Sequence, residues 1–398
     1  MRILRVAQDI FPETVGGAPY HIHALSRDQA ANGHDVTVLT VADELDEREI
    51  VEREGYTLVR QPPKLELLGN QLFTDTIGYL RGTDDYDIVH AHSHLFFSSN
   101  VTAGYCRYTD TPLAVTCHGL NSQRGPFWFS RAHLRTLGKW TYDSADVTFC
   151  YTDVEQSRLR ELGVDADIAV VNNGIDTERF SPTGPQHDEI EAADGPAVVF
   201  VGRLVDGKRP QDALAAFNTV RERCPDAKLF FCGDGPLRER LESTVAEEGL
   251  SDAVRFLGRV PYSEMPTVFR AADLFVLPSR TEGFPRTVLE SLACETPVVS
   301  SNLEQTAKIV DQTGKTVEVG DVAGLADAIS SLVTDRQRLA DLGDHGRDIV
   351  TTRYDWQDTV RETTRVLGQI ADISDPTPKE RKGRASSLPL AQDELDVK

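Results

Sequence analysis

The residues most suited to chemistry are two glutamates, Glu282 and Glu290, in the stretch LFVLPSRTEGFPRTVLESLACETPVVSS. The pattern predicts a buried strand, a loop carrying Glu282 and Gly283, and a helix that starts near Pro285 and carries Glu290. Carboxylates accept hydrogen bonds from hydroxyl groups, and a glycine lets the backbone approach a ligand closely. The pair therefore suits a sugar or a ribose, although two solvated surface glutamates would give the same spacing.

A second feature is the basic loop in VGRLVDGKRP, where Arg203 and Lys208 follow a predicted strand that ends at Gly202. Arginine can hold phosphate oxygens with two parallel hydrogen bonds, and lysine adds a mobile positive charge. The Gly-x4-Gly-Lys-Ser/Thr order of a Walker loop is missing. Taken alone, the loop fits a solvated basic segment equally well. Together with the two glutamates it predicts a diphosphate clamp.

Short apolar runs alternate with helical stretches along most of the chain and place these loops at strand ends. The first series of predicted strands covers 2–8, 35–40, 57–60, 88–91, 113–117, 147–151 and 168–171, with helical spacing over 20–32, 71–81 and 154–162. The second series covers 197–201, 228–232, 254–257, 274–277 and 298–300. Near-continuous apolar strands alternating with helices predict parallel sheets that are covered on both faces. We therefore expect an α/β protein with two Rossmann-like doubly wound domains.

The chain divides at 181–196, a segment with three prolines, two glycines, four acidic residues and no periodicity. We expect an N-terminal domain over 1–180, a linker over 181–196 and a C-terminal domain over 197–352. A further helix is predicted over 353–373. The polar residues 374–398, which are poor in bulky side chains, are expected to form a disordered tail.

The composition fits a globular protein and excludes several other classes. Hydrophobic residues make up 40% of the 398, and no apolar run is long enough to cross a bilayer. The six cysteines form no close pair, so we expect neither a zinc site nor a disulfide framework. The N-terminus lacks a signal-peptide pattern. These features predict a cytoplasmic protein.

The formal charge is −21, and arginine far outnumbers lysine among the 42 basic residues. A dense carboxylate surface keeps a protein hydrated in a salt-rich cytoplasm, so the composition favours a halophilic origin, although ordinary acidic cytosolic proteins share it. The same field repels nucleic acid, and we expect no nucleic-acid partner. Any anionic substrate must be held by a local concentration of positive groups.

Ordered motifs over about residues 1–370 resemble the retaining glycosyltransferase family 4, also called glycosyl transferase group 1. They are VGGAPYHIHALSRDQAANGHDVTVLT, DIVHAHSH, VTCHG, VNNGIDTERFSP, VGRLVDGKRP, FCGDGP, VRFLGRV and the EGFPRTVLE block. The resemblance implies the GT-B fold, in which an N-terminal acceptor domain and a C-terminal nucleotide-sugar domain, both Rossmann-like, face a cleft. It also implies that the helix over 353–373 crosses back to the N-terminal domain.

The resemblance implies specific roles for the clamp and the glutamates. Arg203 and Lys208 would contact the donor diphosphate, Glu290 the nucleotide ribose, and Glu282 the hydroxyls of the transferred sugar. Members of the family need no divalent ion, because this clamp does the work that a metal does elsewhere. We therefore expect no metal and no other cofactor.

Further donor contacts are implied for four residues with small or apolar side chains, Gly16, Gly17, Gly283 and Phe284. The two N-terminal glycines would form a loop that faces the diphosphate across the cleft. His118, at the end of the strand in VTCHG, would point into the site near the C6 hydroxyl of the donor and would act in catalysis with the clamp and the first glutamate. A core or capping histidine is the alternative for this position.

Three other histidines, His90, His92 and His94, occupy alternate positions of one predicted strand. Alternate strand residues point to one face of a sheet. Such a row does not form the closed set of ligands that a structural metal requires. We therefore expect these side chains to be structural or to line the cleft.

The sequence departs from the family pattern at three positions. Lys308 stands where a glutamate is usual, Glu295 lies near a usual glycine, and Arg286 replaces a small or apolar residue. These differences bear on donor choice and on activity. They leave the expected fold unchanged.

One segment, FWFSRAHLRTLGKW, bears on the acceptor. Arg131, Arg135 and Lys139 repeat every four residues and share one face of a predicted helix, with Trp128 beside them. A basic stripe with aromatic residues suits anionic lipid headgroups or a phosphorylated lipid carrier, and implies a peripheral contact with the inner face of the membrane. A core-packing amphipathic helix with a solvated basic face fits the same pattern.

The expected reaction is the metal-independent transfer of a hexose-type sugar, with retention, from a UDP-, GDP- or ADP-type donor to a glycan or lipid-linked acceptor. No carboxylate pair with double-displacement spacing is evident, so we expect front-face attack with the clamp stabilising the departing diphosphate. Two other functions fit the same motifs. A sugar-nucleotide epimerase would need proton-transfer groups and no acceptor, and an inactive sugar-nucleotide-binding partner protein would keep the site without turnover.

Overall fold

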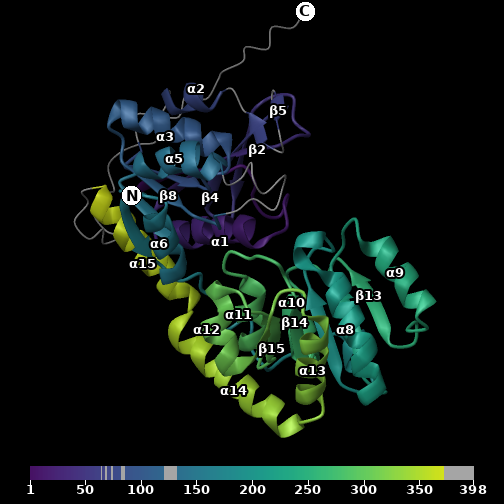
Figure 1. The fold of residues 1–398 in the computed structure, drawn as a ribbon. Coiled ribbons are helices and arrows are strands. Elements are labelled where there is room, and N and C mark those ends of the chain that lie inside the picture. The colour runs from purple at the N-terminus through teal and green to yellow at the C-terminus, as the bar shows by residue number, and fades with distance from the viewer. Residues whose placement is uncertain (64, 68–69, 73–74, 82–85, 121–131, 372–398) are drawn as a thin grey trace, which may run out of the picture.

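A computed structural model of the chain describes residues 1–63, 65–67, 70–72, 75–81, 86–120 and 132–371. Within these residues the chain forms two large sheets with helices packed on both faces of each (Figure 1). This arrangement confirms the predicted α/β class with two doubly wound domains. The predicted tail, 374–398, lies outside the described residues.

The N-terminal sheet has eight strands in the order β10-β9-β8-β7-β1-β2-β4-β3, and every pair is parallel except β3 with β4. Its strands are β1 (Arg2–Val6), β2 (Asp35–Val41), β3 (Glu49–Arg53), β4 (Tyr56–Gln61), β7 (Ile88–His92), β8 (Leu113–Thr116), β9 (Val147–Cys150) and β10 (Asp167–Val170). A separate antiparallel hairpin joins β5 (Leu65–Leu67) and β6 (Asn70–Leu72).

Helices cover both faces of this sheet because its strands are apolar on both sides. The helices are α1 (Gly17–Ala31), α2 (Thr76–Arg81), α3 (Phe97–Thr109), the π-helix η1 (Leu134–Gly138), α5 (Lys139–Asp143) and α6 (Asp153–Glu161). On β1, Leu4 and Val6 join the core beneath α3, whereas Ile3 joins the core on the opposite face. The charged Arg5 is fully buried and donates to Ser26 of α1 over 2.9 Å.

The C-terminal sheet has six parallel strands in the order β13-β12-β11-β14-β15-β16. Its strands are β11 (Ala197–Val201), β12 (Lys228–Cys232), β13 (Val254–Gly258), β14 (Leu274–Leu277), β15 (Val298–Ser301) and β16 (Gly314–Val317). Its helical elements are α7 (Asp188–Glu191), the 3-10 helix η2 (Asp206–Lys208), α8 (Pro210–Arg223), α9 (Arg238–Glu247), α10 (Met265–Ala271), α11 (Arg286–Ala293), α12 (Glu304–Thr313), α13 (Val322–Val333) and α14 (Arg336–Arg353).

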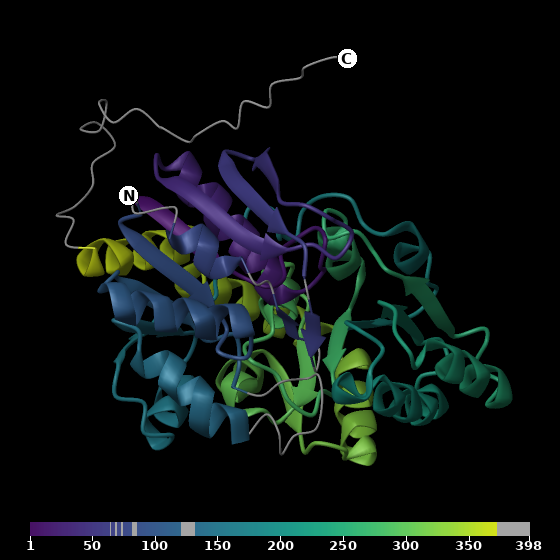
Figure 2. The same cartoon turned by 90° about the horizontal axis from the view of Figure 1, so that it is seen from above.

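The last helix, α15 (Trp356–Ile370), leaves the C-terminal domain and packs on the N-terminal domain (Figures 1 and 2, yellow). Its Trp356 and Val360 form an apolar cluster with Leu25 of α1, and Leu367 joins the core beneath β1. The Trp356 Nε1–H also donates to Asp28 over 2.5 Å. The helix is amphipathic, and its apolar face is buried by a domain other than the one that precedes it.

Local structure differs from the sequence-based expectation in two places. The range 71–81, predicted as one helix, contains the end of β6, and α2 begins only at Thr76. The segment 181–196, predicted as a linker without regular structure, contains α7, whose Ile190 is buried in the core of the C-terminal domain. A single apolar residue per turn is enough to dock so short a helix, although it gives no readable periodicity.

In the part of the chain that the structure describes, no helix combines the length and the apolar character that crossing a bilayer requires. The six cysteines are unpaired, and five of them are buried.

Candidate functional site

The candidate site lies at β11, where the strand order of the C-terminal sheet reverses. The next strands in the chain, β12 and β13, lie on one side of β11, whereas β14 lies on its other side. Ligands of open α/β sheets bind at the carboxyl ends of the strands at such a point. The loop after β11 starts at Gly202, which has a φ of 154°, and it is pressed against the loop after β12. A Cβ on Gly233 would lie 1.9 Å from the carbonyl oxygen of Gly202, so only glycine fits at position 233 of the FCGDGP motif.

The basic loop and the first glutamate meet at this point. Lys208, on η2 after β11, places its Nζ 2.5 Å from Oε1 of Glu282, in the loop after β14. The two loops are also joined by the backbone, because the N–H of Arg280 donates to the carbonyl of Gly207 over 2.9 Å. Arg203 is exposed on the same basic loop. Lys208 of the sequence-predicted clamp and the Glu282 carboxylate therefore lie side by side.

The second glutamate lies deeper in the same domain. Glu290, one turn into α11, is only 3% exposed and accepts a hydrogen bond from the Tyr262 hydroxyl over 2.8 Å. The Nε of Arg286 lies 3.8 Å from the Oε1 of Glu290. Burial raises the pKa of Glu290, while the Arg286 cation and the Tyr262 hydroxyl oppose this effect. A ligand hydroxyl that reached this carboxylate would compete with Tyr262.

Arg286 crosses from the C-terminal to the N-terminal domain. Its guanidinium donates to Oδ1 of Asn173 over 3.1 Å and to the carbonyl of Gly174 over 3.0 Å. It also lies over the rings of Tyr20, at 5.2 Å, and of Trp356, at 5.6 Å. Sequence reasoning noted Arg286 only as a departure from a pattern. Its bridging role depends on residues far apart in the chain, and only the VNNG motif around Asn173 gave a signal.

The glycines predicted to face the donor lie at the contact between the domains. Gly16 precedes α1, and a Cβ on Gly17 would lie 3.5 Å from Cδ of Arg286. Gly283 approaches the N-terminal domain, since a Cβ added to it would lie 3.6 Å from the Cα of Gly119. The loop that contains Gly119 and the loop that contains Gly283 therefore touch where the two domains meet.

The His118 ring makes its hydrogen bonds within the N-terminal domain. Its Nδ1 lies 2.8 Å from the Tyr151 hydroxyl, and its Nε2 lies 3.0 Å from Nδ1 of His92. Burial lowers the pKa of His118 to about 3, so the ring is neutral. The ring thus has partners other than a donor hydroxyl, while its backbone carbonyl lies against Gly283.

The neighbouring histidines are buried side chains of the N-terminal core. His90 pairs with the Thr116 hydroxyl at 2.7 Å, and His94 with the Tyr142 hydroxyl at 2.6 Å. Burial lowers the pKa of each. Over the described ranges, no group of three or more histidine, cysteine or carboxylate side chains is arranged to hold a metal ion.

The remaining predicted residues contribute less directly. The Phe284 ring is buried and stacks on Tyr354 at 5.7 Å, so only its backbone can reach a ligand. Lys308 is exposed on α12. Glu295 follows α11 with a φ of 62°, a left-handed conformation that explains why a glycine is usual near it.

The basic stripe is not present as a row of available cations in the described residues. Trp128 and Arg131 lie outside these residues, and Arg135 is exposed on η1. Lys139 forms an ion pair with Asp143 and lies 3.8 Å from Asp165. Its charge is therefore neutralised locally, an outcome that spacing alone could not reveal.

Two known families match the chain in sequence. The family described as Glycosyltransferase Family 4 matches residues 15–179, and the one described as Glycosyl transferases group 1 matches residues 186–349. A Mycobacterium tuberculosis glycogen synthase is 30% identical over 399 residues, which cover 92% of this chain and 94% of the relative. A GDP-mannose-dependent phosphatidylinositol monomannoside mannosyltransferase of the same organism is 28% identical, with coverage of 89% and 95%.

Solved structures agree in fold. A sucrose-phosphate synthase from Thermosynechococcus elongatus superposes with a TM-score of 0.78 at 21% identity, over 93% of this chain and 98% of that one. An Anabaena protein solved in complex with UDP-glucose gives a TM-score of 0.76 at 21% identity, over 93% and 100% of the two chains. At such identities the likeness establishes the architecture alone.

Proposed function

This chain belongs to the group 1, family 4 glycosyltransferases of the GT-B fold, and from this premise we propose that it transfers a hexose-type sugar from a nucleotide-diphosphate donor to a glycan or lipid-linked acceptor. The proposed transfer retains the anomeric configuration and needs no divalent metal. It takes place in the cytoplasm, with a peripheral contact at the inner face of the membrane when the acceptor is lipid-linked. Curated relatives named as glycogen synthase and as a phosphatidylinositol monomannoside mannosyltransferase motivate the two acceptor classes.

The observation that carries this proposal is the Lys208–Glu282 pair at the strand-order reversal. In the absence of donor each group neutralises the other. A bound diphosphate would take Lys208 and Arg203 as its cations, and Glu282 would then accept hydrogen bonds from hydroxyls of the sugar. The amino-terminal end of α11, which follows Glu282 in the chain, adds N–H groups and a favourable dipole for phosphate.

The acceptor hydroxyl would attack the anomeric carbon on the face from which the diphosphate departs. Bond breaking places negative charge on the diphosphate oxygens, where Arg203 and Lys208 stabilise it without a metal ion. The departing phosphate oxygen takes the proton of the attacking hydroxyl. Glu290 would exchange the Tyr262 hydroxyl for a ribose hydroxyl and so fix the nucleotide.

A thermal-shift panel of UDP-, GDP- and ADP-sugars tests the donor site, with the wild type, Glu290→Ala and the exposed control Glu248→Ala. A ligand that binds only the folded state stabilises it, by about 2.7 kcal/mol at a concentration of 100 times Kd. We expect one nucleotide class to raise the melting temperature of the wild type and the control, and the Glu290 variant to lose this shift.

NMR of the product formed with the stabilising donor then gives the anomeric configuration. A folded wild type that responds to no donor would instead favour the inactive binding partner. A changed sugar nucleotide formed without any acceptor would favour an epimerase.

A further inference from the structure

An apolar surface on the N-terminal domain plays no part in the site described above. Among the described residues, eight large apolar side chains are exposed, and five of these lie together on α2, α3, η1 and α5. They are Ile77, Phe97, Tyr108, Leu137 and Trp140. They border a shallow groove of about 390 Å³, which we call the α3 groove. Isolated exposed apolar residues are normal, whereas a contiguous set from four elements marks an interaction surface.

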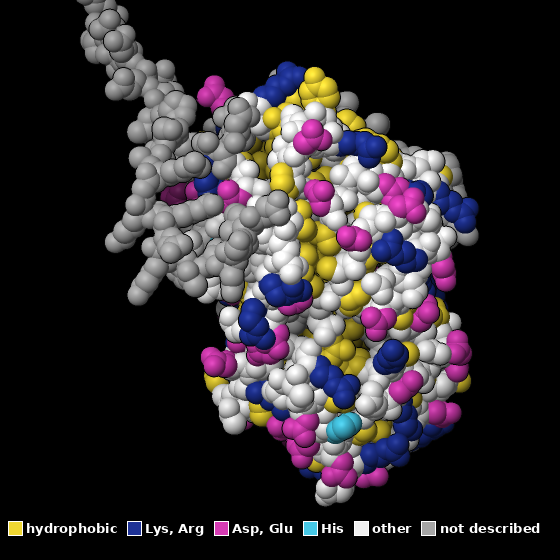
Figure 3. All heavy atoms as spheres, turned by 90° about the vertical axis from the view of Figure 1, so that its left-hand side faces the viewer, with side chains coloured by type: hydrophobic (Ala, Val, Ile, Leu, Met, Phe, Trp, Pro, Cys, Tyr) yellow, Lys and Arg dark blue, Asp and Glu magenta, His cyan; other side chains and the backbone are white. Residues whose placement is uncertain are grey.

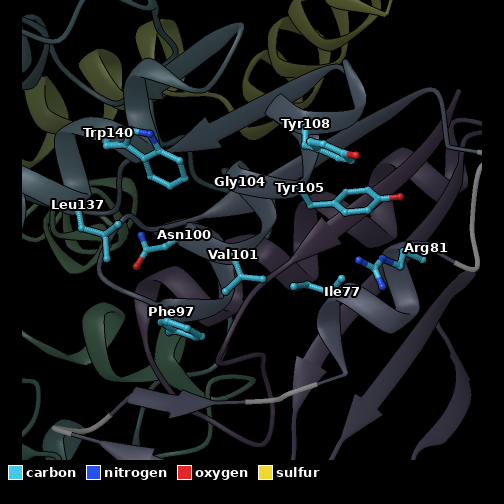
Figure 4. Close-up of a pocket in the computed structure, with 10 residues that line it drawn as sticks. All are labelled: Ile77, Arg81, Phe97, Asn100, Val101, Gly104, Tyr105, Tyr108, Leu137 and Trp140. Atoms are coloured by element: carbon cyan, nitrogen blue, oxygen red, sulfur yellow. The ribbon is translucent and has the colours of Figure 1, made fainter.

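The α3 groove is built along one face of a helix. Figure 4 shows side chains from α3 between Ile77 and Arg81 on one side and Leu137 and Trp140 on the other. The α3 residues at the groove repeat with helical spacing, at positions 97, 100, 101, 104, 105 and 108. Gly104 keeps the floor low, because a Cβ there would lie 3.3 Å from the Trp140 ring. Tyr108 is 89% exposed at one end of the groove.

One arginine lines this apolar surface, and two more lie on the helices that form it. Arg81 lines the groove, Arg107 precedes Tyr108 on α3, and Arg135 lies on η1 two residues before Leu137. All three side chains are exposed, and in the described part of the chain no ion pair involves them. Elsewhere acidic and basic side chains are interspersed, as on the face in Figure 3, and arginines such as Arg60 and Arg223 pair with carboxylates. On a chain of net charge −21, three such exposed arginines on the helices that form an apolar groove are a local exception.

We propose that the α3 groove docks on the surface of a lipid bilayer that carries anionic headgroups. Tyrosine and tryptophan favour the boundary between headgroups and acyl chains, because each has an apolar body and a polar edge. The guanidinium groups supply the attraction to anionic lipid that the overall negative charge would otherwise prevent. The purpose of this contact, access to a lipid-linked acceptor, rests on the proposed function. The binding itself does not.

The test is flotation of the full chain, without donor or acceptor, with vesicles of phosphatidylcholine alone or mixed with phosphatidylglycerol. We expect binding to the anionic vesicles, weaker binding to the zwitterionic ones, and a decrease in both cases for the double variant Tyr108→Ser, Leu137→Ser. The control Val319→Ser alters a C-terminal-domain side chain that is 40% exposed, close to the 38% of Leu137, and it should bind like the wild type.

Arg107→Gln tests the charged rim against Arg336→Gln, which makes the same change in net charge at an exposed position of α14. Arg107→Gln should weaken binding to anionic vesicles about fivefold, the equivalent of about 1 kcal/mol per basic residue near a membrane surface. Arg336→Gln should leave binding unchanged. Because all five altered positions lie outside the proposed donor site, donor-induced thermal shifts should persist in every variant.

Three results would overturn the inference. The wild type could fail to float with anionic vesicles, or the groove and control variants could bind equally. Alternatively, light scattering could reveal a dimer that Tyr108→Ser, Leu137→Ser dissociates, which would make the groove an interface between copies of the chain. Loss of donor-induced thermal shifts in the wild type would instead contradict the proposed function and leave the vesicle result standing.

Discussion

Two ion pairs in the C-terminal domain hold the groups that we assign to the donor. Lys208 pairs with Glu282 at 2.5 Å near the surface, and Glu290 lies buried beside Arg286 and Tyr262. Neither carboxylate is a free surface glutamate. Each instead has a partner that a ligand phosphate or hydroxyl would have to replace, so donor binding exchanges existing contacts for new ones.

At this scale the clamp gives a kinetic prediction. Arg203→Ala or Lys208→Ala should lower kcat by about 100- to 1,000-fold, because each removes a donor that stabilises charge developing in the transition state. Lys315→Ala, on β16 away from the clamp, should keep normal turnover. Arg203 is exposed, so its variant should also unfold within about 0.5 kcal/mol of the wild type. Steady-state kinetics with normal turnover in either clamp variant would remove that residue from the proposed mechanism.

At the scale of elements, loops after strands and the first turns of helices position the functional groups. Helix α6 begins with two side-chain hydrogen bonds, in which Thr152 accepts from the N–H of Glu155 over 3.1 Å and Glu155 accepts from the N–H of Tyr151 over 2.9 Å. The first bond is the N-cap half of a capping box, while the second reaches the residue before the N-cap. Together they fix the helix that follows Tyr151, the partner of His118, and they bury the Glu155 carboxyl almost completely.

This helix start makes stability depend on pH. Burial raises the pKa of Glu155 from 4.5 to about 7. Since the folded state holds the proton more tightly than the unfolded state, the stabilising contribution is complete below about pH 4.5 and is lost as the pH rises through about 7. Relative to Glu155→Gln, the wild type should therefore lose up to about 3 kcal/mol of unfolding free energy between these pH values.

Urea denaturation of both proteins across this range, followed by tryptophan fluorescence, measures the difference. Trp140 and Trp356 report on the N-terminal domain, because both pack on it. A constant gap between the two proteins at every pH would contradict a raised pKa for Glu155.

At the scale of the whole molecule, the two domains are connected by more than the segment between them. Helix α15 belongs in sequence to the C-terminal end, yet its apolar face packs on α1 and beneath β1. Arg286 adds a bridge from α11 to Asn173. The domains are therefore joined both by a long shared helix and by contacts that lie at the proposed donor site.

The net charge of −21 gives a prediction at the same scale. Like charges on a compact molecule repel one another, and salt screens them over a Debye length that falls from about 10 Å at 0.1 M to about 3 Å at 1 M. The melting temperature of the full chain should therefore rise as KCl increases over this range. A matched series with sucrose, which changes no ionic strength, separates screening from general stabilisation. A melting temperature that falls with KCl would argue against the proposed halophilic adaptation.

Sequence alone determined the fold class and the family, and it predicted the clamp residues. Apolar strands alternating with helices leave few arrangements that bury both sheet faces, and Arg203, Lys208 and Glu282 each follow a readable strand. Helical spacing also predicted α6 over 154–162, within one residue of its observed bounds at each end, because this spacing is a local signal.

Only the tertiary structure decided the partners of these residues. Arg286 looked like an irregular substitution and proved to be a buried bridge to Asn173, while Lys139 looked like part of a basic stripe and proved to be paired with Asp143. Ion pairs and burial depend on side chains brought together from distant parts of the chain, and spacing along one element carries no information about them. For the same reason, the α3 groove became visible only once four helical elements, α2, α3, η1 and α5, lay side by side.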